Sequence, residues 1–142
     1  MRIRLLMVGK TRRPELRALV EDYTARIRRS NPVEVAEVRD AAAAAKKLDA
    51  DRAATVVLLD AGGRQPDSEE FAKWLARLRD TGTRELVFLC GSAEGFPEEL
   101  RRRAQHKLSL GAITLSHELA RVVLAEQIYR ALAILSGSPY PK

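Results

Sequence analysis

Residues 55–95 read TVVLLDAGGRQPDSEEFAKWLARLRDTGTRELVFLCGSAEG, and the fold class follows from them. Thr55–Leu59 and Leu86–Cys90 are short, uninterrupted apolar runs, which are typical of strands buried on both faces of a sheet. Between them, Asp67 and Glu70 have the spacing of a capping box at the start of a helix. This strand–helix–strand order predicts an α/β fold with an open, mostly parallel sheet and helices on both faces.

The alternation continues toward the N-terminus. Residues 3–8 (IRLLMV) predict a first strand, and Pro14 fits the first position of a helix. Residues 33–38 alternate apolar with acidic positions and predict a half-exposed strand, whereas residues 40–53 predict a surface helix. The first helix has an apolar stripe at helical spacing, formed by Leu16, Leu19, Val20, Tyr23 and Ile27.

The C-terminal third predicts a short helix, a brief strand and a long helix. The short helix is expected from Pro97 to about Gln105, the strand over 113–115, and the long helix over about 118–136. This last helix is apolar on almost every side, so we expect a second subunit to cover it. No linker or repeat divides the chain, and residues 1–142 are expected to form a single domain.

Composition excludes several classes of protein. Apolar residues make up 46% and charged residues 31%, and no segment approaches the ~20 uninterrupted apolar residues of a membrane span. The single cysteine, Cys90, excludes an intramolecular disulfide. We therefore expect a soluble protein of the reducing cytoplasm with no membrane partner.

Positive charge is concentrated at the N-terminal end. The net charge is +6, and residues 1–30 hold nine Lys and Arg against three Asp and Glu, while the remaining residues balance sixteen against sixteen. Such a local excess is the electrostatic signature of nucleic-acid binding, although a solvated helix face in an arginine-rich protein would give the same pattern. The basic face of the first helix carries Arg17, Arg26, Arg28 and Arg29.

Three loops are predicted to meet at the carboxyl edge of the sheet, where parallel sheets bind ligands: residues 60–66, 91–96 and 108–117. The glycine loop Gly91–Gly95 matches neither the dinucleotide nor the nucleoside-triphosphate fingerprint. With His106 and His117 as the only histidines and one cysteine, no metal site is expected. A lone His117 is more often a structural residue than a base.

The C-terminal block is the most specific part of the sequence. Residues 108–131, LSLGAITLSHELARVVLAEQIYRA, with GSPY at 137–140, resemble the SPOUT-superfamily methyltransferases that modify N3 of pseudouridine in large-subunit ribosomal RNA. The VGK at residues 8–10, the strand end at Leu59-Asp60 and the glycine loop occur in the family's order and spacing. The resemblance covers essentially the whole chain.

The resemblance implies a trefoil-knotted C-terminal half, in which the last helix threads under a loop and packs against the same region of a second subunit. It also implies that the methyl donor S-adenosylmethionine is held in the knot, mainly by backbone, with no metal. Leu59 would cover the adenine and Gly91 would allow close approach of the backbone. The donor would be wrapped by Leu110, Gly111, Ala112, Ile113, Thr114 and Leu115.

The resemblance further assigns roles at the RNA. His117 and Arg121 would face the cleft near the base, and Arg121 would orient the base or a phosphate or stabilise the deprotonated imide. Tyr140 would position the substrate from the second subunit. Glu126, by its spacing on the helix alone, is expected to hold Arg121 or Arg130 across helix turns. Ribosomal RNA or the ribosome is the implied partner, contacted through phosphates by Arg17, Arg26, Arg28 and Arg29.

The sequence departs from the family at its end. The family's tail usually reads Tyr-His-Lys or Tyr-His-Arg, whereas this chain has Tyr140-Pro141-Lys142. Two alternatives therefore stay open. One is a knotted ribosome- or RNA-binding protein that has lost methyl transfer. The other is a nucleotide- or flavin-binding signalling module on an ordinary open sheet, which the apolar last helix argues against.

Overall fold

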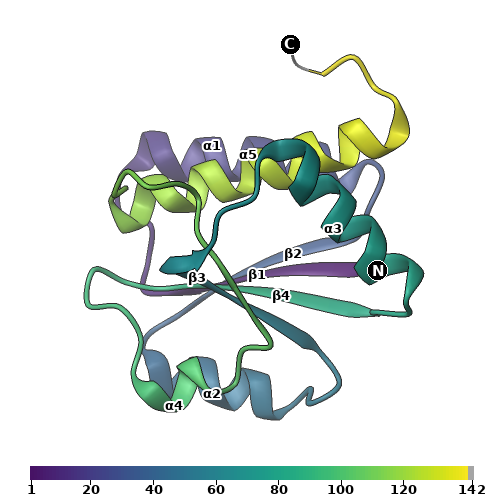
Figure 1. Cartoon of the computed structure of the whole chain (residues 1–142). Coiled ribbons are helices and arrows are strands. Elements are labelled where there is room, and N and C mark those ends of the chain that lie inside the picture. The colour runs from purple at the N-terminus through teal and green to yellow at the C-terminus, as the bar shows by residue number, and fades with distance from the viewer. Residues whose placement is uncertain (141–142) are drawn as a thin grey trace.

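A five-stranded parallel sheet forms the centre of the computed structural model, which describes residues 1–140 (Figure 1). The strands lie in the order β2-β1-β4-β3-β5, and every neighbouring pair is parallel. The elements are β1 (Arg2–Val8), α1 (Pro14–Arg28), β2 (Val33–Val38), α2 (Ala41–Asp49), β3 (Thr55–Arg64), α3 (Ser68–Asp80), β4 (Glu85–Cys90), α4 (Glu98–Arg101), β5 (His106–Leu108) and α5 (His117–Ser136).

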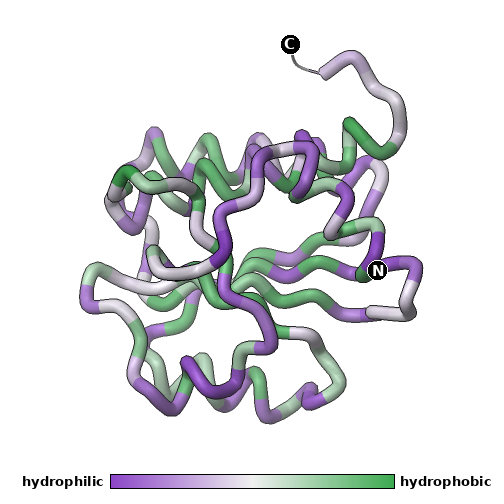
Figure 2. The backbone as a smooth tube through the Cα atoms, in the orientation of Figure 1, coloured by the Kyte–Doolittle hydropathy of each residue, from purple (hydrophilic) through white to green (hydrophobic). Residues whose placement is uncertain are grey.

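Helices cover both faces of the sheet, as predicted. Helices α1, α3 and α5 lie on one face, and α2 and α4 lie on the other (Figure 1). The central strands are apolar along their length in Figure 2, because alternate side chains of each strand enter the two cores. Phe88 of β4 belongs to the first core, and its neighbours Val87 and Leu89 belong to the second.

The capping box at the start of α3 is confirmed. The Asp67 carboxylate accepts a hydrogen bond from the Glu70 backbone N–H (2.7 Å), and the Glu70 carboxylate accepts one from the Asp67 backbone N–H (2.9 Å). Two of the helix's free N–H groups are thereby satisfied. The local signal in the sequence was sufficient here because both partners lie within one turn.

Two of the predicted strand boundaries are wrong. Residues 113–115 form no strand; the last strand is His106–Leu108, at the edge of the sheet beside β3. Strand β3 does not stop at Leu59 but continues to Arg64, because β5 pairs with its extension. A three-residue edge strand carries little periodicity, whereas the β-branched residues Ile113 and Thr114 resemble a strand in composition alone.

Helix boundaries also differ from the predictions. Helix α2 ends at Asp49, and α4 has only four residues, Glu98–Arg101. Leu19, placed on the buried stripe of α1, is 41% exposed. It lies on the flank of α1, which packs against α5 through the remaining apolar residues of the stripe.

The chain makes a close crossing where β3 meets the segment after β5. Leu108 pairs with Leu59 and again with Arg64, and the Ser109 N–H donates to the Arg64 carbonyl oxygen (2.8 Å). A Cβ atom at Gly63 would lie 2.6 Å from the Lys107 carbonyl carbon, so the two backbones touch. Residues 109–116 then run across the end of β3 toward α5 (Figure 1). This crossing supports the trefoil knot that the resemblance predicts.

Helix α5 packs against both α1 and α3. Ser116 caps its first turn by accepting a hydrogen bond from the Leu119 N–H, and Gly137 ends it in the left-handed conformation (φ +76°). Its buried side chains are small or apolar except for Glu118 and Arg121 in the first turns, and Leu119, Ile134 and Leu135 stay exposed. No helix within residues 1–140 is long and apolar enough to cross a lipid bilayer.

Candidate functional site

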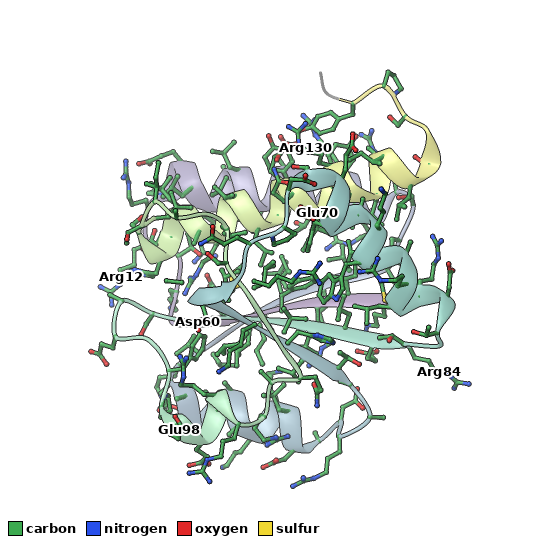
Figure 3. The ribbon with its side chains drawn as sticks, in the orientation of Figure 1. Arg12, Asp60, Glu70, Arg84, Glu98 and Arg130 are labelled. Atoms are coloured by element: carbon green, nitrogen blue, oxygen red, sulfur yellow. The ribbon has the colours of Figure 1, made fainter. Side chains whose placement is uncertain are left out.

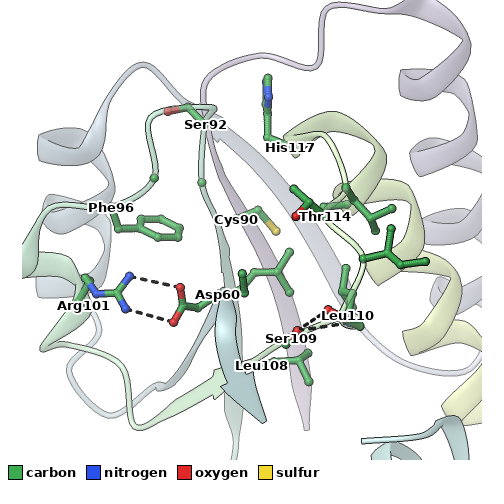
Figure 4. Close-up of a pocket in the computed structure, with 18 residues that line it drawn as sticks. Asp60, Cys90, Ser92, Phe96, Arg101, Leu108, Ser109, Leu110, Thr114 and His117 are labelled. Atoms are coloured by element: carbon green, nitrogen blue, oxygen red, sulfur yellow. Dashed lines mark hydrogen bonds and ion pairs between the residues drawn. The ribbon is translucent and has the colours of Figure 1, made fainter. Parts of the chain in front are cut away.

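A pocket of about 240 Å³ opens at the carboxyl edge of the sheet. Leu59, Cys90 and Leu108, on the three adjacent strands β3, β4 and β5, lie on its wall, as predicted for a parallel sheet (Figure 4). The loop after β4 and the segment between β5 and α5 form the two sides. The position follows from topology, because all strands end at this edge.

The predicted donor segment lines this pocket. Seven of the eight residues assigned to the donor are on its wall, and Ala112 is not. Ile113 is 83% exposed, so it borders the mouth rather than the floor. The seven are Leu59, Gly91, Leu110, Gly111, Ile113, Thr114 and Leu115.

A tight turn holds the segment after β5 in place. The Ser109 hydroxyl donates to the Gly111 carbonyl oxygen (2.9 Å) and accepts from the Gly111 N–H (3.3 Å). Gly111 has φ +146°, a conformation that side-chain-bearing residues rarely adopt. The wall is therefore made of turned main chain and apolar side chains, which suits a ligand recognised through backbone groups.

Gly91 has a neighbour that the sequence did not indicate. A Cβ atom at Gly91 would lie 3.0 Å from Cζ of Phe96, whose ring points toward this glycine (Figure 4). The loop between them is closed by a bridge between Ser92 and Gly95. Glycine at position 91 thus leaves room for an aromatic side wall.

An ion pair on the same wall was also missed. The Arg101 guanidinium contacts both carboxylate oxygens of Asp60, at 3.1 and 3.4 Å, and the carboxylate raises the pKa of Arg101. This bidentate pairing links α4 to the middle of β3. The sequence contained one usable signal, since Asp60 follows a buried strand at the ligand edge.

Cys90 lies at the pocket but is not a nucleophile. Its side chain is buried, and burial raises the pKa of the thiol to about 12. The thiol is therefore neutral at physiological pH. Cys90 packs in the core as a small apolar residue.

A family model described as predicted SPOUT methyltransferase matches residues 1–141 of the chain. The chain belongs to the SPOUT methyltransferase family. Proteins named ribosomal RNA large subunit methyltransferase H are similar over 99% of the chain: that of Geobacter sulfurreducens is 42% identical, with 99% of its length covered, and that of Dinoroseobacter shibae is 41% identical, with 98% covered.

Solved structures share the fold of this SPOUT methyltransferase at low sequence identity. A tRNA (m1G37) methyltransferase from Aquifex aeolicus aligns with a TM-score of 0.63 at 15% identity, covering 100% of this chain and 75% of that one. A probable methylase family protein from Haemophilus influenzae also gives 0.63, at 11% identity, with 99% and 70% covered. The fold prediction is confirmed by this likeness.

His117 is the predicted catalytic residue that lies at the pocket of this SPOUT methyltransferase. It is the first residue of α5, lines the pocket and is partly exposed (Figure 4). Its Nε2 lies 3.9 Å from a carboxylate oxygen of Glu118. The side chain can therefore exchange a hydrogen bond or a proton with a ligand at the mouth.

Arg121 does not face the cleft, contrary to the expectation. Its side chain is 0% exposed, and its guanidinium donates to the carbonyl oxygens of Val8 (2.8 Å) and Gly9 (3.0 Å) and to Oγ1 of Thr11 (2.9 Å). Burial lowers the pKa of Arg121 from its ordinary value. Arg121 ties α5 to the end of β1 and lies below the surface of the chain.

Tyr140 also lies away from the pocket of its own chain. Its hydroxyl donates to Glu126 (2.9 Å), which raises the pKa of Tyr140 together with burial, and its ring lies 4.5 Å from that of Tyr129. The Tyr140 side chain therefore packs on the middle of α5, since Glu126 lies nine residues, roughly 14 Å, along the helix from His117 at the pocket. Glu126 also pairs with Arg130 (2.8 Å), not with Arg121. Pro141 lies outside the described residues.

The arginines of α1 are mostly occupied by the protein itself. Arg17 pairs with Glu37 (3.0 Å), Arg26 pairs with Asp22 (3.3 Å), and Arg28 donates to the Val33 carbonyl oxygen (3.4 Å). Helix α1 begins at the pocket edge and runs about 22 Å away from it, so its last turn, with Arg26, Arg28 and the exposed Arg29, lies at the opposite edge. The predicted RNA-contacting set is not gathered near the pocket.

No group of three or more His, Cys, Asp or Glu side chains that would hold a metal ion is present within residues 1–140.

Acid is expected to weaken a contact beside the pocket. Glu118 accepts hydrogen bonds from the N–H groups of Arg13 and Arg12, which lower its pKa below the ordinary 4.5. Because the folded-state pKa is the lower one, ionised Glu118 stabilises the fold above about pH 4.5, and this contribution is lost as pH falls through the folded-state value. We expect Glu118→Gln to cost roughly 1–2 kcal/mol at pH 7 and less at pH 3.

Urea unfolding at both pH values measures this difference. Glu21→Gln is the matched control, because Glu21 is exposed on α1 and its carboxylate has no partner among residues 1–140. A cost of Glu118→Gln that is the same at pH 7 and pH 3 would contradict the assignment.

Proposed function

We propose that the chain transfers a methyl group from S-adenosylmethionine to N3 of a pseudouridine in large-subunit ribosomal RNA. The observation that carries the proposal is the pocket at the carboxyl edge, whose wall is the segment that the resemblance assigns to the donor. Membership of the SPOUT methyltransferase family supports the reaction class. The names of the relatives supply the RNA substrate.

The pocket residues fit the donor. Leu59, Leu110 and Leu115 offer apolar surface for an adenine ring, and the turned main chain at 109–111 offers polar groups. S-adenosylmethionine supplies an electrophilic methyl group on a sulfonium when it is bound. Asp60 and Arg101 lie together on the wall as an ion pair, which presents polar groups to a ligand but no net charge.

The protein's own task is then positioning and proton removal. The reaction forms an N3–C bond and breaks an S–C bond, leaving a neutral thioether, and the imide proton leaves N3. Of the ionisable side chains on the wall, Asp60 and Arg101 bind each other and Cys90 stays protonated, which leaves His117 at the mouth. His117 therefore binds or accepts the imide proton. The remaining rate acceleration comes from holding the base in line with the methyl group.

The proposal includes a homodimer through α5. Exposed Leu119, Ile134 and Leu135 on this helix and exposed Ile113 at the pocket mouth are apolar surfaces that a second subunit would cover. Tyr140 packs on the middle of α5 and does not line the pocket of its own chain, so we assign its contribution to the site of the other protomer. The implied compartment is the cytoplasm, where ribosomes are found.

Methyl incorporation tests the function. Ribosomes and free ribosomal RNA from a strain that lacks the enzyme are incubated with the protein and donor labelled in the methyl group, and donor affinity is measured by calorimetry. We expect label in large-subunit RNA. Donor binding with no label in any RNA would overturn the enzyme and favour a knotted RNA-binding protein.

Gly91→Ala is expected to weaken donor binding at least about tenfold, because the new methyl group meets the Phe96 ring at 3.0 Å on the pocket wall. Calorimetric titration with S-adenosylmethionine measures the loss. The double variant Gly91→Ala/Phe96→Ala separates two causes. Recovery of affinity shows that Gly91 serves to admit the ring, whereas continued loss shows that donor and backbone approach each other at Gly91. Wild-type affinity in Gly91→Ala would contradict both.

A further inference from the structure

The loop between β1 and α1, residues 9–13, is a basic segment beside the pocket. Charged side chains of other elements hold its backbone through several hydrogen bonds. Arg121 binds the Gly9 carbonyl oxygen and the Thr11 hydroxyl (3.0 and 2.9 Å), and Glu118 accepts from the N–H groups of Arg12 and Arg13 (both 3.1 Å). These bonds join the loop to the first turns of α5, directly after pocket residue His117.

A third group completes the fastening from β2. Glu37 accepts a hydrogen bond from the Thr11 N–H (2.7 Å), and Arg17 joins Glu37 to the Thr11 carbonyl oxygen (2.8 Å). These bonds lower the pKa of Glu37, although burial opposes them. Buried or half-buried charged groups thus hold the loop on two sides. The backbone from which its side chains project is therefore fixed in position.

The backbone of the loop is bonded to the rest of the protein, whereas its charged side chains are exposed. Lys10 and Arg12 are exposed, and neither side chain has a hydrogen bond or an ion pair among residues 1–140. Arg13 is also exposed but pairs with Glu15 (3.0 Å). Figure 3 shows Arg12 at the end of the molecule that carries the loop after β4, with Arg84 at the opposite end. Two exposed cations are therefore carried by a loop whose backbone is bonded to Glu118, the residue after His117 of the pocket.

We propose that the loop 9–13 is the phosphate-contacting element that seats RNA at the pocket, with Lys10 and Arg12 as contacts and Arg121 and Glu118 as positioning residues. The proposal rests on the proposed function for the identity of the RNA. Free, exposed cations on a rigid backbone suit phosphate oxygens, because little ordering is required when the RNA binds. The arginines on the last turn of α1 lie at the other edge, too far to seat a base at this pocket.

The test compares Lys10→Ala/Arg12→Ala with Lys46→Ala/Lys47→Ala. The control removes the same charge from exposed lysines of α2, on the opposite face of the sheet, whose side chains have no partner within the described chain. Binding to purified large ribosomal subunits is measured across a salt series, together with methyl transfer to ribosomes and donor affinity.

The loop variant is expected to bind large subunits roughly tenfold or more weakly at 0.1 M salt, and to reduce the slope of log affinity against log salt by about 2. Donor affinity and the melting temperature stay at wild-type values, and the control binds as wild type does. Equal binding and equal slopes for the two double variants would overturn the proposal.

Glu118→Gln tests the positioning role. With Lys10 and Arg12 in place but their backbone loosened, the KM for ribosomes should rise several-fold while donor affinity is retained. An unchanged KM would overturn this part. Failure of the proposed function has a different signature, namely no methyl transfer by the wild type, and subunit binding still decides the role of the loop.

Discussion

Gly63→Ala is expected to destabilise the protein by about 2–4 kcal/mol and to abolish donor binding. A Cβ atom at Gly63 would lie 2.6 Å from the Lys107 carbonyl carbon and 2.8 Å from the Leu108 nitrogen, both backbone atoms that cannot rotate away. Relief requires β5 to separate from the end of β3. Because the donor wall begins at Leu108, the same movement displaces the pocket.

Gly62→Ala is the matched control for this variant. Its Cβ atom would meet only the Asp60 carboxylate, at an ordinary 3.6 Å, so the change is expected to stay within about 1 kcal/mol of wild type. Urea unfolding and calorimetric titration of both variants give the comparison. Equal stability of the two would show that β3 and β5 do not depend on this contact.

Arg121→Met is expected to cost about 3–5 kcal/mol of stability, which is about 10 °C in melting temperature for a chain of this size. Methionine fills the space but leaves the carbonyl oxygens of Val8 and Gly9 without their buried donor. Methyl transfer should fall with it, because the loop 9–13 loses its anchor. Arg121→Lys should recover part of the stability, since lysine keeps the positive charge but lacks the several N–H donors of the planar guanidinium.

The outcome separates a buried anchor from a substrate contact. If Arg121 touched RNA, as the family resemblance implied, Arg121→Met would keep the melting temperature and lose only activity. A wild-type melting temperature for Arg121→Met would therefore contradict the structure's assignment. Thermal unfolding followed by circular dichroism provides the measurement.

Local patterns predicted the elements whose partners are near in sequence. Buried strands such as Leu86–Cys90 and the Asp67 capping box need no knowledge of the rest of the chain. The β3 extension and β5 were missed because each is stabilised by the other across the crossing at Gly63, and neither has a periodic pattern of its own. Their pairing is a tertiary effect that overrides propensity.

The functional site likewise combines features that the sequence could predict with features that depend on contacts between distant segments. Parallel strands must end at one edge, so the position of the pocket could be predicted, and the family resemblance implied most of the residues on its wall. The direction of a single side chain could not, because Arg121 on a helix may face solvent or core depending on what packs there. Its partners at Val8 and Gly9 are more than a hundred residues away in sequence. Phe96 and the pair Asp60–Arg101 likewise depend on contacts between separate loops.

The most direct test of the methyltransferase is nucleoside mass spectrometry on ribosomes from a strain that lacks it, incubated with the purified protein and donor bearing a deuterated methyl group. The predicted result is one deuterated methyl group on N3 of a pseudouridine in the large-subunit RNA, absent when Gly63→Ala replaces the wild type. Tight donor binding by the wild type with no deuterated nucleoside in any RNA would contradict the account.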